Sequence, residues 1–347
     1  MPRHVTIKEV AAAAGFSYQT VSKVLNNQVK VSKQTEERIW KVANEMGYHP
    51  NFIARSLRSQ RSGMIGFSWE PYPPDQTNQI YSHFMESIIH YCENNGYHIL
   101  AFPYKAGSEW VDSYRNLIET NRVDGFILTS IEREDARIVF LQEQNFPFVA
   151  FGRSNPEWHF PFVDVDGAVG MRMVVEHLVS QGHKRIALIN WSEVKSSSVG
   201  IDRMKGCMEA LNKAGINVPA HWIARGEGDF ASAYKTSLEW LDTDPDLRPT
   251  AIITFCDVMA IGVMNAALNL GIRVGTDLAI TGFDDSPQVQ FMVPSLTSIQ
   301  QPIWEVGCKV SEMLLGILTG NPPANQAILL EPKLIVRDSS SQPCNSS

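Results

Sequence analysis

Residues 6–26 read TIKEVAAAAGFSYQTVSKVLN, and this stretch decides the fold of the amino-terminal part of the chain. Thr6 is a good helix N-cap, and Glu9 follows it at the spacing of a capping box. The apolar residues after it recur at helical spacing, so we expect a first helix that ends at Gly15, where glycine tolerates a left-handed conformation. Ser17 can cap a second helix directly after this turn.

The second helix is expected to have one apolar and one polar face. Val21, Val24 and Leu25 should pack inward, whereas the polar face should carry Tyr18, Gln19, Ser22 and Lys23. A third helix should begin at Ser32 and end at Gly47. Two short helices joined by a glycine turn, with a polar second helix, are typical of an all-α helix-turn-helix unit that reads DNA.

The charge distribution supports DNA binding. Residues 1–62 contain ten Lys or Arg and four Glu, a net charge of +6, so the other 285 residues carry −13 of the total of −7. A basic head on an acidic body favours phosphate binding by the head alone. An ordinary amphipathic helix pair is the alternative, but the caps, the glycine turn, the polar face and the charge asymmetry coincide here.

Length and composition indicate several domains without a metal. A chain of 347 residues with 44 % hydrophobic content exceeds one typical core, so two or three domains are expected. The five cysteines are scattered without metal-ligand spacing, which favours free thiols in a reducing compartment. Neither a signal segment nor an apolar run long enough to span a membrane is present, so we expect a cytoplasmic protein.

From residue 64 onward, short β-branched or aromatic runs alternate with longer amphipathic stretches. Strands are expected at 64–69, 97–103, 123–129, 147–152, 162–165, 185–190, 222–226, 250–255 and 278–283. Helices are expected at 79–95, 108–121, 134–145, 167–181, 203–214, 229–242, 257–271 and 303–318. Such alternation predicts parallel, doubly wound α/β sheets, and two sheets fit the length better than one.

Residues 5–69 resemble the LacI/GalR (lactose-repressor) family of bacterial transcriptional regulators. The resemblance rests on TIKEVAAAAGFSYQTVSKVLN, VSKQT, GYHPNFIARSL and MIGF, and it extends more thinly to about residue 338. It implies a three-helix headpiece and a two-lobed, periplasmic-binding-protein-like body. It also implies a nucleoid-associated homodimer that binds double-stranded operator DNA and responds to a small effector.

The resemblance divides the chain into four parts. We expect a helix-turn-helix domain at 1–48, a hinge helix at 49–62, an effector-binding and dimerisation domain at 63–338 and a polar tail at 339–347. The chain should cross between the lobes near 161–163, 292–296 and 322–328. Lobe 1 would then hold about 63–161 plus 296–325, and lobe 2 about 162–292 plus 326–338. The tail lacks leucine heptads, so a dimer is expected rather than a tail-mediated tetramer.

Ten residues are expected to contact DNA: Thr6, Ser17, Tyr18, Gln19, Thr20, Ser22, Lys23, Asn26, Ala54 and Leu57. By the resemblance, Tyr18 and Gln19 are the main base-reading pair, and Leu57 enters the minor groove from the hinge helix. Lys23 replaces the usual arginine, so weaker discrimination of guanine is expected there. The hinge is too short to stay helical alone, and a flexible basic linker is the alternative.

Polar and aromatic residues at or just after the strand ends are candidates for effector binding, because ligands of doubly wound sheets bind at the carboxyl edges of the strands. The candidates are Trp69, Thr129, Arg153, Arg203, Phe230, Asp257 and Asp284, with Arg203 at the start of a helix. The resemblance marks Arg203 and Asp284 as recurrent effector contacts and Phe230 as an aromatic wall, whereas Cys256 replaces a usual asparagine. The alternative for each residue is an ordinary cap or loop charge.

Carboxylates, guanidinium groups and aromatic faces suit a sugar. Arg153 followed by Trp158-His159-Phe160-Pro161-Phe162 favours a glucoside or oligosaccharide, although Arg203 and Asp284 would also serve a purine corepressor. Two other classes remain. A plain sugar-binding protein would need a secretion signal and no basic head, and a sugar enzyme would need a convergent acid, base or metal set, which the sequence lacks. No catalytic residue, metal ligand or cofactor is therefore expected.

Overall fold

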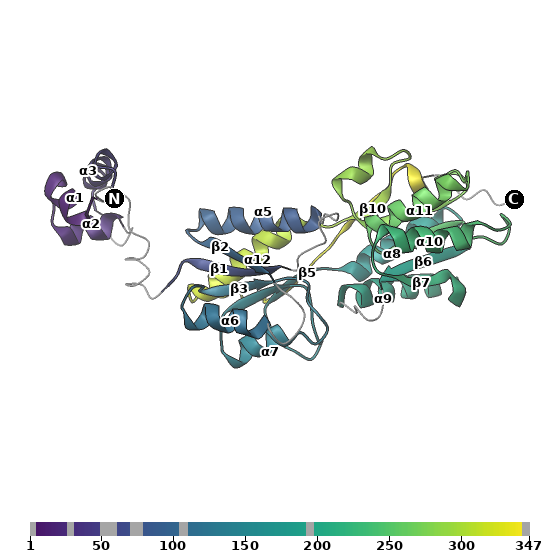
Figure 1. Cartoon of the computed structure of the whole chain (residues 1–347), viewed down its shortest axis with the longest axis horizontal. Coiled ribbons are helices and arrows are strands. Elements are labelled where there is room, and N and C mark those ends of the chain that lie inside the picture. Colours follow the sequence, from purple (N-terminus) through teal and green to yellow (C-terminus); the bar gives the residue numbers. More distant parts are fainter. Residues whose placement is uncertain are drawn as a thin grey trace. The chain divides into compact units, whose positions relative to one another are not determined.

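The computed structural model describes residues 5–25, 31–48, 61–69, 79–103, 110–191 and 198–341 (Figure 1). The chain forms two compact units, Met1–Gly63 and Met64–Ser347. Among the described residues, no helix is both long and apolar enough to cross a membrane.

The first unit consists of α1 (Ile7–Ala14), α2 (Tyr18–Leu25) and α3 (Lys33–Glu45). The predicted capping box of α1 is confirmed, since the Glu9 amide donates to Thr6 Oγ1 and the Thr6 amide donates to Glu9 Oε2 at 2.7 Å. Gly15 ends α1 with a φ of 76°, so the turn between the helices is made as the sequence predicts.

The three helices share one small apolar core. It contains Val10, Ala11, Ala14, Val21, Val24, Leu25, Ile39 and Ala43. One prediction for the polar face of α2 was wrong: Ser22 is only 4 % exposed. It lies four residues after Tyr18 and three before Leu25, on the flank of the face that packs against the core.

The second unit contains two six-stranded sheets. In the first, the strand order is β11-β5-β4-β3-β1-β2 and all strands are parallel. Its strands are β1 (Met64–Trp69), β2 (His98–Pro103), β3 (Gly125–Leu128), β4 (Phe148–Phe151), β5 (Phe162–Val165) and β11 (Ala327–Leu330).

In the second sheet, the order is β12-β10-β9-β8-β6-β7, and only β12 is antiparallel to its neighbour. Its strands are β6 (Ile186–Trp191), β7 (Ile223–Gly226), β8 (Ala251–Thr254), β9 (Ala279–Asp284), β10 (Thr297–Gln300) and β12 (Lys333–Ile335). The predicted doubly wound α/β class is therefore confirmed.

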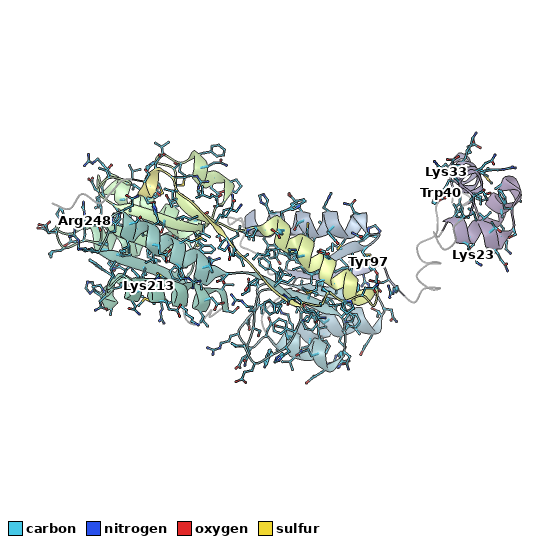
Figure 2. The ribbon with its side chains drawn as sticks, turned by 180° about the vertical axis from the view of Figure 1, so that it is seen from behind. Lys23, Lys33, Trp40, Tyr97, Lys213 and Arg248 are labelled. Carbon is cyan, nitrogen blue, oxygen red and sulfur yellow. The ribbon has the colours of Figure 1, made fainter. Side chains whose placement is uncertain are left out.

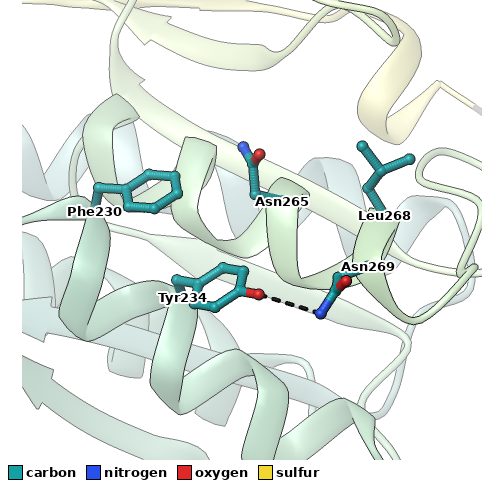
Figure 3. Close-up of a pocket in the computed structure, with 5 residues that line it drawn as sticks. All are labelled: Phe230, Tyr234, Asn265, Leu268 and Asn269. Carbon is teal, nitrogen blue, oxygen red and sulfur yellow. Dashed lines mark hydrogen bonds between the residues drawn. The ribbon is translucent and has the colours of Figure 1, made fainter.

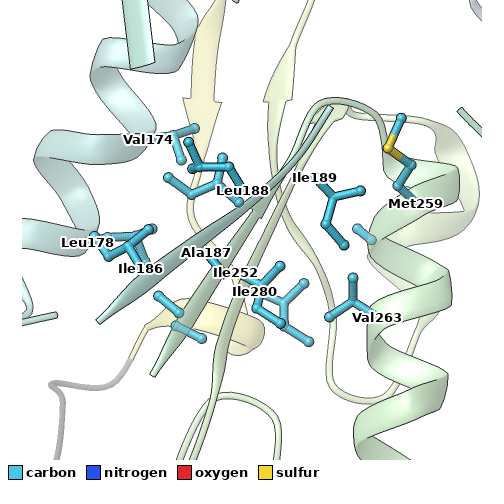
Figure 4. Close-up of a cluster of buried hydrophobic side chains, with 14 of the residues drawn as sticks. Val174, Leu178, Ile186, Ala187, Leu188, Ile189, Ile252, Met259, Val263 and Ile280 are labelled. Atoms are coloured by element: carbon cyan, nitrogen blue, oxygen red, sulfur yellow. The ribbon is translucent and has the colours of Figure 1, made fainter. Parts of the chain in front are cut away.

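Helices cover both faces of each sheet. On the first sheet, α5 (Gln79–Asn94) and α12 (Ile303–Leu318) pack on one face, and α6 (Trp110–Glu119) and α7 (Ala136–Glu143) pack on the other (Figure 1). On the second, α8 (Gly167–Ser180) pairs with α9 (Ser198–Lys213), and α10 (Phe230–Leu241) pairs with α11 (Asp257–Asn269). Figure 4 shows Val174 of α8 and Val263 of α11 on opposite sides of the strands.

The predicted lobe boundaries were wrong by a few residues at each crossing. Strands β5 and β11 belong to the first sheet and β10 to the second, so the chain crosses after Val165, after Gln300 and after Leu330. These strands have only four residues each, and such short runs do not reveal the sheet with which they pair. Below, lobe 1 denotes 64–165 plus 303–330, and lobe 2 denotes 167–300 plus 333–341.

The predicted polar tail also begins too early. Ser339 and Ser340 lie in the short 3-10 helix η4 (Asp338–Ser340) and are fully buried. Ser339 Oγ donates to the Ile280 carbonyl at 2.6 Å, and Ser340 Oγ is 2.7 Å from Thr297 Oγ1. These serines are therefore part of lobe 2, and residues 342–347 lie outside the described residues.

Candidate functional site

Helix α2 presents the candidate DNA-reading side chains. Ser17 Oγ accepts from the Thr20 amide at 3.1 Å, which caps the helix as predicted. Tyr18 is 41 % exposed, and Gln19 and Lys23 are exposed as well. Figure 2 shows Lys23 and, on α3, Lys33 at the surface of the unit. The other candidates separate into exposed Thr6, partly exposed Thr20 and buried Ser22, while Asn26, Ala54, Leu57 and the hinge segment 49–60 lie outside the described residues.

Arg203 and Asp284 come together in lobe 2. The guanidinium of Arg203 donates to the Phe255 carbonyl and lies 3.7 Å from Asp284 Oδ1. Its Cζ is 3.4 Å from the centre of the Phe283 ring and 5.1 Å from that of Trp191. The arginine lies inside α9, not at its start as predicted, because the helix begins five residues earlier at Ser198.

The Arg203–Asp284 pair has hydrogen-bonding capacity that the described residues leave unused. Arg203 is 4 % exposed, and its Nε has no hydrogen-bond partner among the described residues. Asp284 accepts one hydrogen bond from Gln301 Nε2 at 2.7 Å. Its φ is 121°, a backbone conformation that residues other than glycine rarely adopt. Burial raises the pKa of Asp284 to about 6, although Arg203 acts to lower it.

Asp257 lies at the start of α11 but faces the interior. Its carboxylate accepts from the amide and hydroxyl of Ser286, both at 2.7 Å, and from Ser298 Oγ at 2.6 Å. The residue is 1 % exposed, and burial raises its pKa to about 7. A Cβ at Gly282 would lie 2.2 Å from Asp257 Oδ1, so only glycine permits this approach. The structure therefore holds Asp257 as a link between strand ends.

Cys256 stands at the N-cap of α11 without a side-chain cap, and its Sγ is 3.9 Å from the Gly228 carbonyl oxygen. Burial raises the pKa of this thiol to about 12, so it is neutral. The described cysteines 92, 207, 256 and 308 are all free, as predicted. No cluster of metal-ligating side chains occurs among the described residues.

Phe230 is the first residue of α10 and is 41 % exposed. It stacks on Tyr234 with ring centres 5.8 Å apart, and it lines an open depression of about 550 Å³ over α10 and α11 (Figure 3). The depression is also lined by Asn265, Leu268 and Asn269, and Asn269 Nδ2 donates to Tyr234 Oη at 3.2 Å.

In lobe 1, the candidate Thr129 is a buried link. Its hydroxyl is 2.9 Å from Tyr81 Oη. Beneath it lies Arg137, which sequence reasoning missed: its Nη2 is 2.6 Å from Asp135 Oδ2 and donates to the carbonyls of Thr129 and Ser130. An arginine inside an amphipathic helix looks like surface charge in a sequence, so no signal revealed it.

The two other lobe 1 candidates have different surroundings. Trp69 ends β1, is partly buried and packs against the core beneath α5 and α12. Arg153 follows β4 and is bound by two carboxylates, Asp164 of its own lobe at 2.8 Å and Asp202 of α9 at 2.6 Å. The aromatic run after Arg153 belongs partly to the core, since Phe160 is buried and stacks on Phe148.

The candidates thus fall into separate groups. Arg203 and Asp284 meet beside Trp191 and Gln301, two neighbours that the sequence did not identify. Trp191 is the last residue of β6 and lies one position beyond the predicted strand 185–190. Its place directly after that strand was a usable signal. Gln301 follows β10, a strand that was not predicted.

Two family profiles match the chain. Residues 6–51 match "Bacterial regulatory proteins, lacI family", and residues 175–340 match "Periplasmic binding protein-like domain". The first range covers α1 to α3, and the second covers most of lobe 2 together with α12 and β11.

Curated relatives match along nearly the whole chain. The HTH-type transcriptional regulator DegA of Bacillus subtilis (strain 168) is 32 % identical, over 97 % of this chain and 98 % of DegA. The HTH-type transcriptional repressor CytR of Escherichia coli (strain K12) is also 32 % identical, over 96 % of each chain. These relatives are transcriptional regulators and not enzymes, which agrees with the prediction.

Solved structures give the same result. A regulatory protein of the LacI family from Chloroflexus aggregans is 47 % identical, with a TM-score of 0.77 over 81 % of this chain and 99 % of that one. A complex of the transcriptional regulator CelR with cellobiose is 28 % identical, with a TM-score of 0.72 over 97 % and 100 %. The Lac repressor dimer bound to operator and the anti-inducer ONPF is 27 % identical, with a TM-score of 0.81 over 97 % and 99 %. With its helix-turn-helix head and two-sheet body, this chain belongs to the LacI family of bacterial transcriptional regulators.

Proposed function

We propose that this regulator represses transcription by binding a pseudo-palindromic operator as a homodimer, and that a small effector held between its lobes controls the binding. Each head would place the first turn of α2 in the major groove, where Tyr18 and Gln19 contact base edges. One head reads only a half-site, so two-fold symmetry requires two copies. The hinge segment 49–62, with Ala54 and Leu57, would order on the operator and contact the minor groove.

The proposal for DNA binding is supported by the exposed side of α2 and by the net charge of +6 on residues 1–62. It is also supported by a relative of known structure, the Lac repressor, that was solved as a dimer on its operator. Selection from random duplexes tests it. A two-fold symmetric consensus is expected, and Tyr18→Ala with Gln19→Ala should lose the preference for that consensus while keeping salt-dependent binding to any duplex.

The proposal for effector binding rests on one observation, the buried Arg203–Asp284 pair. The guanidinium has an unpartnered Nε among the described residues, and the carboxylate accepts only one described hydrogen bond. A ligand hydroxyl can accept from the first group and donate to the second, so vicinal hydroxyls match the pair. The aromatic ring of Trp191 beside Arg203 would suit the apolar side of a sugar ring.

We propose a sugar, specifically a glucoside or short glucose oligosaccharide, as the effector class. The CelR structure with cellobiose provides the support from a relative, whereas the buried Phe160 removes part of the support from the aromatic run after Arg153. Thermal-shift screening with cellobiose, simple glucosides, adenine and guanine tests the class. Stabilisation by a sugar that Arg203→Ala abolishes is expected, and stabilisation by a nucleobase alone would assign a purine corepressor instead.

A further inference from the structure

Arg153 of lobe 1 makes two bonds to the first turns of α9 in lobe 2. Ser198 Oγ donates to the Arg153 carbonyl oxygen, and Arg153 Nη2 is 2.6 Å from Asp202 Oδ2. Ser198 and Asp202 are four residues apart, so they lie on one side of the helix. Ser198 is buried, and the side chains of Arg153 and Asp202 are each 26 % exposed.

The guanidinium of Arg153 is also anchored within its own lobe. Its Nε donates to Asp164 Oδ2 at 2.8 Å, and Asp164 is a buried residue of β5. Its neighbour in the chain, Val165, is the last residue before the chain crosses to lobe 2. Arg153 thus has one carboxylate from each lobe, so a movement that separates the lobes here would stretch the bond to Asp202, whereas the bond to Asp164 lies within lobe 1.

Helix α9 carries this contact and the candidate effector contact on consecutive residues. Asp202 faces Arg153, whereas Arg203 faces the Phe255 carbonyl and Asp284. Helix α9 packs closely on α8 at Gly206, where a Cβ would lie 2.3 Å from the Ala168 carbonyl oxygen. Such close packing favours movement of α9 together with α8, so a change at either contact would be passed to both helices.

We propose that Arg153 is an interlobe latch: with Ser198 and Asp202 it holds the two lobes in the arrangement described here, and it does not itself contact the effector. This assignment replaces the role in effector binding that was expected for Arg153 from the sequence. The latch itself is independent of the proposed function. Its consequence rests on that function, since a latch next to Arg203 would link effector binding to lobe movement. The ion pair is partly shielded from water, so it is stronger than a fully exposed pair.

Hydrogen–deuterium exchange on the full chain, without DNA or ligand, tests the latch. Asp202→Asn keeps the size of the side chain and removes its charge, and its partly exposed position makes misfolding a small risk. Peptides covering 152–165 and 198–205 should exchange roughly fivefold faster in Asp202→Asn and faster still with Ser198→Ala added, as expected for loss of a contact of about 1 kcal/mol. Peptides covering α5 and α10 should be unchanged.

Two controls complete the test. Arg273→Gln breaks an ion pair within lobe 2, 2.7 Å between Arg273 Nη2 and Asp277 Oδ1, and should leave the 152–165 peptides unchanged. In Arg153→Met, the further change Asp202→Asn should have no additional effect, because the two act through one bond. Unchanged exchange in Asp202→Asn, or fully additive effects, would overturn the latch. If the exchange data support the latch but no sugar alters operator affinity in any variant, the proposed effector control is wrong and the interlobe contact remains supported.

Discussion

Asp284 adjoins the buried Arg203, yet its pKa is raised to about 6 because desolvation outweighs the arginine. A raised native pKa means that the folded state favours the neutral carboxyl. The stability that the neutral Asp284 carboxyl contributes is fully present below 3.8, its pKa in the unfolded chain, and is lost as the pH rises through 6. We therefore predict that the free energy of unfolding of the native protein falls between pH 4 and about 6.5 relative to that of Asp284→Asn, as measured by urea denaturation.

Asp277 provides the matched control for this pH dependence. A hydrogen bond from Arg273 lowers its pKa, so the stability that it contributes is present above 3.8 and is lost as the pH falls. Asp277→Asn should thus reduce stability mainly at neutral pH, which is the opposite sign. If the curves of Asp284→Asn and the native protein run parallel from pH 4 to 6.5, the carboxyl does not titrate in this range.

Lys23 is exposed on α2, where its ammonium acts as a single charge. Lys23→Arg should increase discrimination between guanine and other bases at one operator position by about 1–3 kcal/mol, because a guanidinium can bind guanine O6 and N7 together. Lys23→Ala should weaken binding almost equally across operator variants and reduce the salt slope by about one. Binding titrations against a set of single-base operator variants provide the measurement.

The control for Lys23 is Lys33→Ala, an exposed charge at the start of α3. A strong guanine preference in the native protein that disappears in Lys23→Ala, and that arginine does not improve, would contradict the point-charge account. The same result in Lys33→Ala would show that the effect is general electrostatics.

At the scale of elements, the contact of α8 with α9 depends on a glycine. Alanine is preferred over glycine inside a helix by about 1 kcal/mol, so Gly206→Ala would stabilise an unobstructed helix. Here its Cβ would lie 2.3 Å from the Ala168 carbonyl oxygen and 2.5 Å from Ala168 Cα, and backbone atoms cannot rotate away. We predict a net loss of about 1–3 kcal/mol in the free energy of unfolding, as measured by denaturant titration.

Lys205→Ala is the control, because it lies next to Gly206 on the exposed side of α9. It should change stability by less than about 0.5 kcal/mol. A Gly206→Ala variant as stable as the native protein would mean that α8 and α9 can separate at little cost, and the joint movement of α9 with α8 would then be wrong.

Local chemistry explains which elements could be predicted. The capping box of α1, the Gly15 turn and the Ser17 cap are determined by neighbouring residues, and all three are present in the structure. Strands β10, β11 and β12 have three or four residues each, and their assignment to a sheet depends on partners far away in the chain. Their sequence therefore did not reveal where the chain crosses between the lobes.

At the scale of the whole molecule, the same distinction applies to the candidate site. The resemblance marked both Arg203 and Asp284 as recurrent effector contacts, and in the folded lobe the Arg203 guanidinium lies 3.7 Å from Asp284 Oδ1. The partners of Arg153 and Arg137 were not predictable, because each arginine contacts carboxylates or carbonyls that only the folded lobes bring near. Whether an arginine binds a ligand or links two parts of the protein depends on the groups that the fold places around it.

The charge of the whole chain is divided between a head of +6 and a remainder of −13. DNA affinity should therefore come from the head and depend steeply on salt, and under the proposed function the body controls whether two heads can bind together. An effector that binds two lobe arrangements unequally changes operator affinity by the same factor by which the operator changes effector affinity.

Operator titration with and without a saturating sugar tests this control most directly. The sugar is the one identified by thermal shift, and calorimetry establishes that it occupies its site. We expect the dissociation constant of the selected symmetric operator to change roughly 5- to 150-fold, which corresponds to a coupling of about 1–3 kcal/mol. Binding of a scrambled duplex should remain unchanged. Identical operator affinity at full occupancy of the effector site would contradict the account.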